Sequence, residues 1–133
     1  MLALSNQNNR TQLEYHPLRL GGEARSLPMG VARRPTVSVV IPTLNEAKNL
    51  PLVLPYIPLD WVDEVLLVDG RSTDDTVEVA RNIMPSIKVV LEKTPGKGAA
   101  MRAGYAASTG DIIIILDADG SNDPREIPRF VMA

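Results

Sequence analysis

Cysteine is absent from this sequence, and histidine occurs only once, at His16. The lack of cysteine excludes disulfide bonds, thiolate catalysis and cysteine-ligated metal sites. A Ser-His-Asp triad or a histidine-rich metal site would have to use His16, which lies in a polar N-terminal stretch rich in Asn, Gln and Arg. We therefore expect neither kind of site.

Long apolar segments are also missing. The longest uninterrupted apolar run, 112–116, is far shorter than the roughly 20 residues that a helix needs to cross a bilayer. The first ten residues lack the basic-then-apolar order of a signal peptide. The sequence therefore predicts a cytoplasmic location. For a longer, full-length protein, the cytoplasmic face of the membrane is a separate expectation that these absences do not supply.

Charge is distributed unevenly along the chain. Residues 1–35 carry five Arg against two Glu, a net charge of +3, whereas the remainder carries nine basic and fourteen acidic residues, a net charge of −5. Neither basic nor aromatic residues are concentrated after residue 35, so no nucleic-acid partner is expected. Residues 1–35 show no sustained period and are predicted to form a flexible polar leader, followed by one domain over 36–133.

From Thr36 onward, short runs rich in Val and Ile alternate with segments of helical spacing. Most of these runs are nearly continuous in apolar residues, which is typical of strands covered on both faces of a parallel sheet. The alternation predicts an α/β fold, with a mostly parallel four-stranded sheet and helices on both faces. The predicted strands are 37–41, 64–68, 88–91 and 111–116, and the predicted helices begin near Thr43, Thr73, Gly98 and Asp123.

Two aspartates, Asp117 and Asp119, directly follow the fourth predicted strand. Ligands of open parallel sheets bind beyond the carboxyl ends of the strands, and residues separated by one position at a strand end project to the same side. Paired carboxylates in that place suit Mg²⁺ or Mn²⁺ shared with phosphate oxygens. Asp-x-Asp also occurs as a loop cap, so the residues alone leave both interpretations open.

Two other strand ends carry candidate binding residues. Asp69 precedes a turn and is placed to accept hydrogen bonds from a nucleobase N–H, while Ser72 or Thr73 caps the next helix. Lys97 stands between two glycines at the start of a helix, where backbone N–H groups and a cation can meet an anion. Its spacing is neither that of a P-loop nor that of a dinucleotide site, and a flexible turn is the alternative.

Four motifs, taken together, resemble the family 2 glycosyltransferases of the GT-A fold. They are Val-Ser-Val-Val-Ile-Pro-Thr-Leu-Asn-Glu at 37–46, Val-Asp-Gly-Arg-Ser-Thr-Asp-Asp-Thr at 68–76, Gly-Lys-Gly-Ala-Ala at 96–100 with Thr-Gly-Asp at 109–111, and Asp-Ala-Asp at 117–119. The resemblance is nearest to the polyprenyl-phosphate (dolichol-phosphate-like) sugar transferases. The sequence departs from the family at Gly70-Arg71, where Asp-Gly commonly precedes Ser, and this leaves a bulky cation near the base or ribose.

The resemblance implies a Rossmann-like GT-A half that binds a UDP- or GDP-sugar. It implies Asp119 as the ligand of Mg²⁺ or Mn²⁺, with Asp117 assisting, in a DXD motif. The implied nucleotide contacts come from Pro42, Leu44, Glu46, Asp69, Lys97, Asp117 and Ala118.

The implied reaction transfers a sugar, with inversion and with metal, from the nucleotide to an acceptor such as a polyprenyl phosphate. The catalytic base is expected beyond Ala133, because the chain is expected to be truncated at its C-terminus. Two alternatives stand beside this hypothesis: a catalytically inactive nucleotide-binding fragment, and a sugar-phosphate nucleotidyltransferase. The latter needs a glycine- and arginine-rich loop after the first strand, and residues 42–46 offer none.

Overall fold

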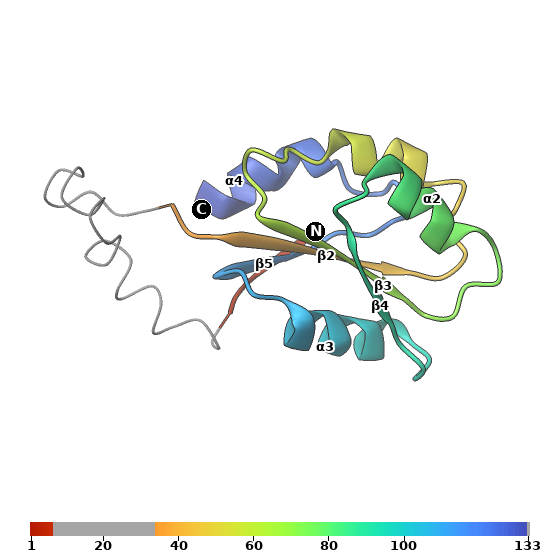
Figure 1. Cartoon of the computed structure of the whole chain (residues 1–133). Helices are drawn as coiled ribbons and strands as arrows, with labels where there is room; N and C mark the ends of the chain where they lie inside the picture. Colours follow the sequence, from red (N-terminus) through yellow and green to blue (C-terminus); the bar gives the residue numbers. More distant parts are fainter. Residues whose placement is uncertain (7–33, 133) are drawn as a thin grey trace, which may run out of the picture.

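The computed structural model describes residues 1–6 and 34–132, which form a five-stranded sheet with helices on both faces (Figure 1). The strand order is β1-β5-β2-β3-β4, and all neighbours are parallel except β1 and β5. The strands are β1 (Leu2–Ser5), β2 (Val37–Thr43), β3 (Glu64–Asp69), β4 (Lys88–Leu91) and β5 (Ile112–Ile115). The predicted α/β fold with a mostly parallel sheet is confirmed.

The central strand is β2, and its composition explains that position. Val39 and Val40 are fully buried although neighbouring side chains in a strand point to opposite faces. Val39 belongs to the larger core cluster and Val40 to the smaller one on the other face. β-Branched side chains pack well on such a doubly covered strand. The continuous apolar run therefore reflects burial from two sides.

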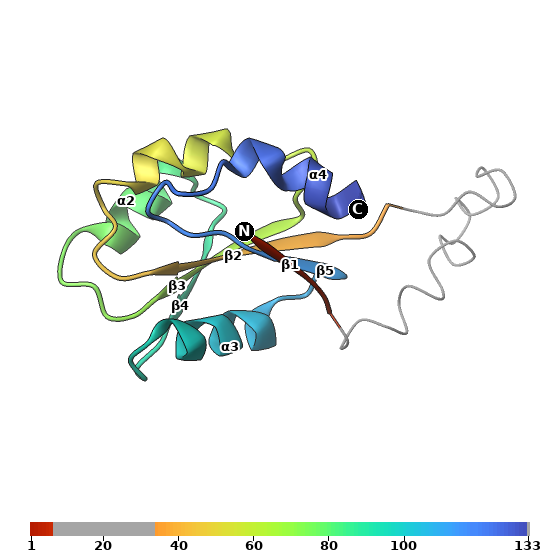
Figure 2. The same cartoon turned by 180° about the vertical axis from the view of Figure 1, so that it is seen from behind.

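The helices divide between the two faces of the sheet (Figures 1 and 2). One face is covered by α3 (Lys97–Ala107), which packs on β2 and β3. The other face is covered by α2 (Thr76–Ile83), α4 (Ile127–Met132) and three short 3-10 helices, η4 (Leu50–Leu52), η5 (Leu54–Tyr56) and η6 (Pro124–Glu126). No helix in the described ranges is both long and apolar enough to cross a membrane.

The helix predicted to open at Thr43 is wrong. Thr43 ends β2, and its hydroxyl donates to Asp69 Oδ1 at 2.9 Å instead of capping a helix. Pro51 and Pro55 follow, and each is the second residue of a short 3-10 helix rather than part of a continuous α-helix. By contrast, Asp123 caps the next turn as predicted, because its Oδ1 accepts from the backbone N–H of Arg125 at 3.0 Å.

The helix α3 approaches the sheet closely at Gly104. A Cβ added at this position would lie 2.3 Å from Val40 Cγ1 and 3.1 Å from Val68 Cγ2. Only glycine allows the helix to approach β2 and β3 this closely. Because Lys97 begins the same helix, this close packing also fixes where the start of α3 stands relative to the strand ends.

The fifth strand comes from the segment that was predicted to be a leader. Leu2–Ser5 pairs antiparallel with β5, and Asn6 extends the pairing by donating to the carbonyls of Gly110 and Asp111, each at 2.7 Å. A four-residue strand has too little periodicity to be read locally, and it forms because the outer edge of β5 supplies the backbone partners. The rest of the predicted leader, 7–33, lies outside the described residues, and the domain boundary at 36 stays a prediction.

Candidate functional site

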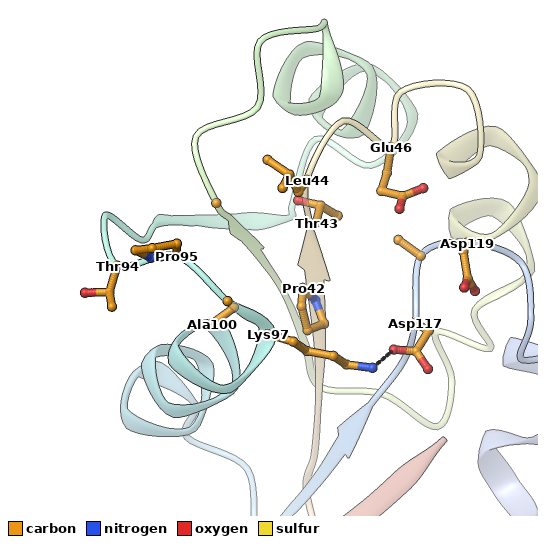
Figure 3. A pocket seen from close by; sticks show the side chains of 13 residues that line it. Pro42, Thr43, Leu44, Glu46, Thr94, Pro95, Lys97, Ala100, Asp117 and Asp119 are labelled. Atoms are coloured by element: carbon orange, nitrogen blue, oxygen red, sulfur yellow. Dashed lines mark hydrogen bonds and ion pairs between the residues drawn. The ribbon is translucent and has the colours of Figure 1, made fainter.

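The carboxyl ends of β2, β3 and β5 and the start of α3 surround one cavity of about 370 Å³ (Figure 3). Parallel strands deliver their carboxyl ends to the same edge of the sheet, which is why segments far apart in the sequence meet there. The predicted site residues that line the cavity are Pro42, Leu44, Glu46, Lys97, Asp117, Ala118 and Asp119.

Other residues line the same cavity although sequence analysis did not assign them. They are Thr43, Gly70, Thr94, Pro95, Gly96 and Ala100. Three of them, Thr43, Gly70 and Gly96, are direct chain neighbours of assigned residues at the polar strand ends, and that adjacency is the signal that could have found them. Ala100 lies three residues after Lys97 in α3 and so shares its helix face.

Asp69 is the predicted site residue that does not line the cavity. Its side chain is buried, with 2% of the residue exposed. Asp69 Oδ1 accepts from the hydroxyls of Thr43 at 2.9 Å and Ser72 at 2.6 Å, and Oδ2 accepts from the Ser72 N–H at 2.9 Å. The carboxylate therefore joins the end of β2 to the loop after β3. Its contact with a nucleotide stays a prediction.

Asn45 also joins the loop after β2 to the loop after β3 through hydrogen bonds. Its side-chain oxygen accepts from the backbone N–H groups of Thr73 at 2.8 Å and Asp74 at 3.2 Å, and its own N–H donates to Ser72 Oγ at 2.8 Å. The backbone of Asn45 has φ 55°, a left-handed conformation that asparagine tolerates better than most residues. The loops that carry Leu44, Glu46 and Gly70 are thus held as one rigid wall of the cavity.

The opposite wall carries charge. The Lys97 ammonium pairs with Asp117 Oδ1 (Figure 3), and the two side chains are 57% and 31% exposed. Exposed ion pairs contribute only about 0–1 kcal/mol, so an incoming anion or cation can separate this one. Lys97 would then be available to an anion and Asp117 to a cation.

Asp119 stands on the same rim as Asp117. The side chain of Ser121, then its backbone N–H at 2.9 Å from Asp119 Oδ1, and finally the charge of Lys97 hold the pKa of Asp119 below its ordinary value. Asp119 is therefore ionised throughout the neutral range. A carboxylate that keeps its charge while facing a cavity is suited to bind a cation.

The cavity supplies part of the ligand set that a divalent metal requires. Within 1–6 and 34–132, no group of three or more His, Cys, Asp or Glu side chains gathers in one place. Asp117 and Asp119 both line the cavity, however, and two carboxylates supplemented by phosphate and water oxygens form a set that Mg²⁺ accepts. The residues fit a metal shared with a bound ligand better than one held by the protein alone.

A comparison with protein families matches the part of the chain that contains the cavity. The profile described as "Glycosyl transferase family 2" matches residues 38–133, which include every cavity-lining residue. An uncharacterized glycosyltransferase of Mycobacterium tuberculosis is 45% identical over 95 residues, covering 71% of this chain and 42% of the relative. An undecaprenyl-phosphate 4-deoxy-4-formamido-L-arabinose transferase of Pseudomonas savastanoi is 40% identical over 105 residues, covering 71% and 31%. The chain thus spans less than half the length of these relatives.

Solved structures show the same architecture. Glucosyl-3-phosphoglycerate synthase from Mycobacterium tuberculosis, crystallised with Mn²⁺, UDP and glucosyl-3-phosphoglycerate, superposes with a TM-score of 0.62 at 32% identity, covering 71% of this chain and 37% of that one. A mannosyl-3-phosphoglycerate synthase from Rubrobacter xylanophilus gives a TM-score of 0.62 at 28% identity, covering 68% and 33%.

Proposed function

The chain belongs to glycosyl transferase family 2, and on that premise we propose that it is the donor-binding half of an inverting, metal-dependent sugar transferase. The observation that carries the proposal is the meeting of Pro42, Leu44, Glu46, Lys97, Asp117 and Asp119 around one cavity at the carboxyl edge of the sheet. A UDP- or GDP-sugar is the ligand that we assign to it.

The two walls of the cavity suit the two ends of such a ligand. The wall built from the loops after β2 and β3 is rigid and largely uncharged where Leu44 and Gly70 line it, which suits a nucleoside. The wall built from Lys97, Asp117 and Asp119 is charged, which suits a diphosphate. Lys97, at the first turn of α3, would lie against a phosphate together with backbone N–H groups of that turn.

We assign Mg²⁺ or Mn²⁺ to Asp119, with Asp117 as the second carboxylate. When bound, the metal would neutralise charge on the diphosphate leaving group. The residues of the charged wall orient the diphosphate and hold it, and Ser121 keeps Asp119 ionised. In the reaction, an acceptor oxygen bonds to the anomeric carbon of the sugar, the bond from that carbon to the diphosphate oxygen breaks on the opposite face, and the nucleoside diphosphate leaves.

A polyprenyl phosphate is the acceptor that we propose for the whole protein. The support is the relative named as an undecaprenyl-phosphate sugar transferase, of which this chain covers 31%. The acceptor site and the catalytic base are assigned to parts of the protein outside the cavity described here.

The test is a thermal-shift series on the 133-residue chain with UDP and GDP, each with and without Mn²⁺. A ligand that binds only the folded protein stabilises it by about 2.7 kcal/mol at a hundred times its Kd. We expect one nucleotide to raise the Tm by several degrees when Mn²⁺ is present. Calorimetric titration of the same nucleotide should then give a Kd that rises when Mn²⁺ is removed.

Asp119→Ala should abolish the Mn²⁺-dependent part of this stabilisation. Asp60→Ala is the matched control, because Asp60 is an exposed carboxylate in the turn before β3 and does not line the cavity. If the wild-type chain responds to no nucleotide, the proposed function is refuted. If the Asp119→Ala chain responds like wild type, the assignment of the metal to Asp119 is refuted.

A further inference from the structure

Arg71 has a backbone conformation that its side chain disfavours. Its φ is 68°, in the left-handed region where the Cβ of an L-residue crowds the following carbonyl and where glycine is free of strain. Asn45 is the other non-glycine residue with positive φ in the described ranges, and its side-chain hydrogen bonds to the loop after β3 account for it. Nothing comparable accounts for Arg71.

The side chain of Arg71 is exposed and makes no hydrogen bond, ion pair or ring contact with another described residue. This holds although the same loop contains the acidic residues Asp74 and Asp75. The folded chain in 1–6 and 34–132 thus gains no hydrogen bond or ion pair from the guanidinium that would offset its strained backbone. Residues held in such strained conformations cluster at active sites and ligand-binding sites.

Arg71 stands beside the cavity. The preceding residue, Gly70, lines the cavity wall, and its N–H donates to the carbonyl of Thr43 at 2.9 Å. The following residue, Ser72, is fixed by Asp69 and Asn45. The backbone on both sides of Arg71 is therefore anchored, so Arg71 adjoins the part of the cavity wall that the loops after β2 and β3 form.

We infer that Arg71 is a specificity-determining residue whose guanidinium binds the nucleobase of the donor. The inference rests on the proposed function. Figure 3 shows Leu44 at one end of the cavity and the Lys97–Asp117 pair at the other. With the diphosphate bound at the charged wall, the nucleoside would bind at the wall beside Arg71. A guanidinium donates paired N–H groups to carbonyl oxygens and also stacks on planar rings, neither of which an ammonium does equally well.

The chemistry selects among bases. Uracil and guanine present carbonyl oxygens that accept from the guanidinium, whereas adenine presents an amino group at the corresponding edge. Arg71 should therefore favour UDP or GDP over ADP, and removing it should reduce that preference.

Three variants of the full chain separate strain from recognition. Arg71→Gly removes both the guanidinium and the backbone strain, Arg71→Ala removes the guanidinium but keeps a Cβ, and Arg71→Lys keeps a cation without the planar fork. Arg81→Ala, on the exposed side of α2 and away from the cavity lining, is the charge-matched control. Without nucleotide, we expect Arg71→Gly to raise the Tm by a few degrees and Arg71→Ala to leave it near that of wild type.

Calorimetric titration with UDP, GDP and ADP, each with Mn²⁺, then measures recognition. We expect Arg71→Gly and Arg71→Ala to weaken the preferred nucleotide by about tenfold or more while changing ADP little, with Arg71→Lys intermediate and Arg81→Ala unchanged. A lowered Tm with unchanged Kd would show a structural role and overturn the inference, as would equal weakening of all three nucleotides. If wild type binds none of them, the proposed function and this inference fail together; if wild type binds and Arg71→Gly binds equally well, only the inference fails.

Discussion

Replacing Gly104 by alanine tests how the packing of α3 controls the site. The added Cβ would lie 2.3 Å from Val40 Cγ1, well inside the roughly 3.5–4.0 Å at which two carbon atoms attract. Val40 is fully buried in the central strand, and its branched side chain has little rotamer freedom. The clash must therefore be relieved by moving α3 away from the sheet.

Two effects of opposite sign decide the magnitude. Alanine is better than glycine inside a helix by about 1 kcal/mol. Overpacking a filled core is unfavourable by about 1–3 kcal/mol, and the 2.3 Å contact places this substitution towards the upper part of that range. The net expectation for Gly104→Ala is a loss of about 1–2 kcal/mol in the free energy of unfolding, or a Tm lowered by about 4–12 °C for a domain of this size.

Gly98→Ala, in the same helix, is the matched control. A Cβ at Gly98 would meet only the end of the Arg102 side chain, at 3.4 Å, so the helix-propensity gain should stand unopposed. The assay is urea or thermal unfolding of both variants beside wild type, followed by nucleotide titration. A Gly104→Ala chain as stable as wild type, or both variants shifting in the same direction, would refute the packing argument.

Two carboxylates outside the cavity lining give further predictions. Burial would raise the pKa of Glu64, but hydrogen bonds from Lys88, Ser38 and Thr109 outweigh burial and set the pKa below 4.5. The ionised side chain therefore stabilises the fold at every pH above the pKa that Glu64 has in the unfolded chain. This stabilisation is lost as the pH falls through the pKa that Glu64 has in the folded protein. Glu64→Gln should thus unfold about 1–2 kcal/mol more easily at pH 7 and show a weaker acid dependence below pH 4.5; parallel pH curves would contradict this. Asp69→Asn should lower stability by about 1–3 kcal/mol even without nucleotide, since an amide cannot accept all the hydrogen bonds that the buried carboxylate accepts, and an unchanged Tm would contradict it.

The sequence was most informative where function and local pattern coincide. The Val- and Ile-rich runs gave four parallel strands to within two residues at each end, because strands covered on both faces leave little room for polar side chains. The Asp-x-Asp after β5 was found because a carboxylate pair at a strand end is conspicuous. The predicted helix at Thr43 failed because the Thr43 hydroxyl bonds to Asp69, which is 26 residues away in the sequence.

By itself, the sequence determined the four parallel strands and the edge of the sheet at which the predicted site residues gather, since parallel strands send their carboxyl ends to one side. The tertiary structure decided which contacts the residues near that edge make. It buried the Asp69 carboxylate, joined two loops through the Asn45 side chain and paired Leu2–Ser5 with the outer edge of β5. It also left the Arg71 guanidinium without a partner in the described fold. The first three outcomes depend on contacts between residues distant in the chain, the fourth on the lack of such a contact, and no local propensity encodes either.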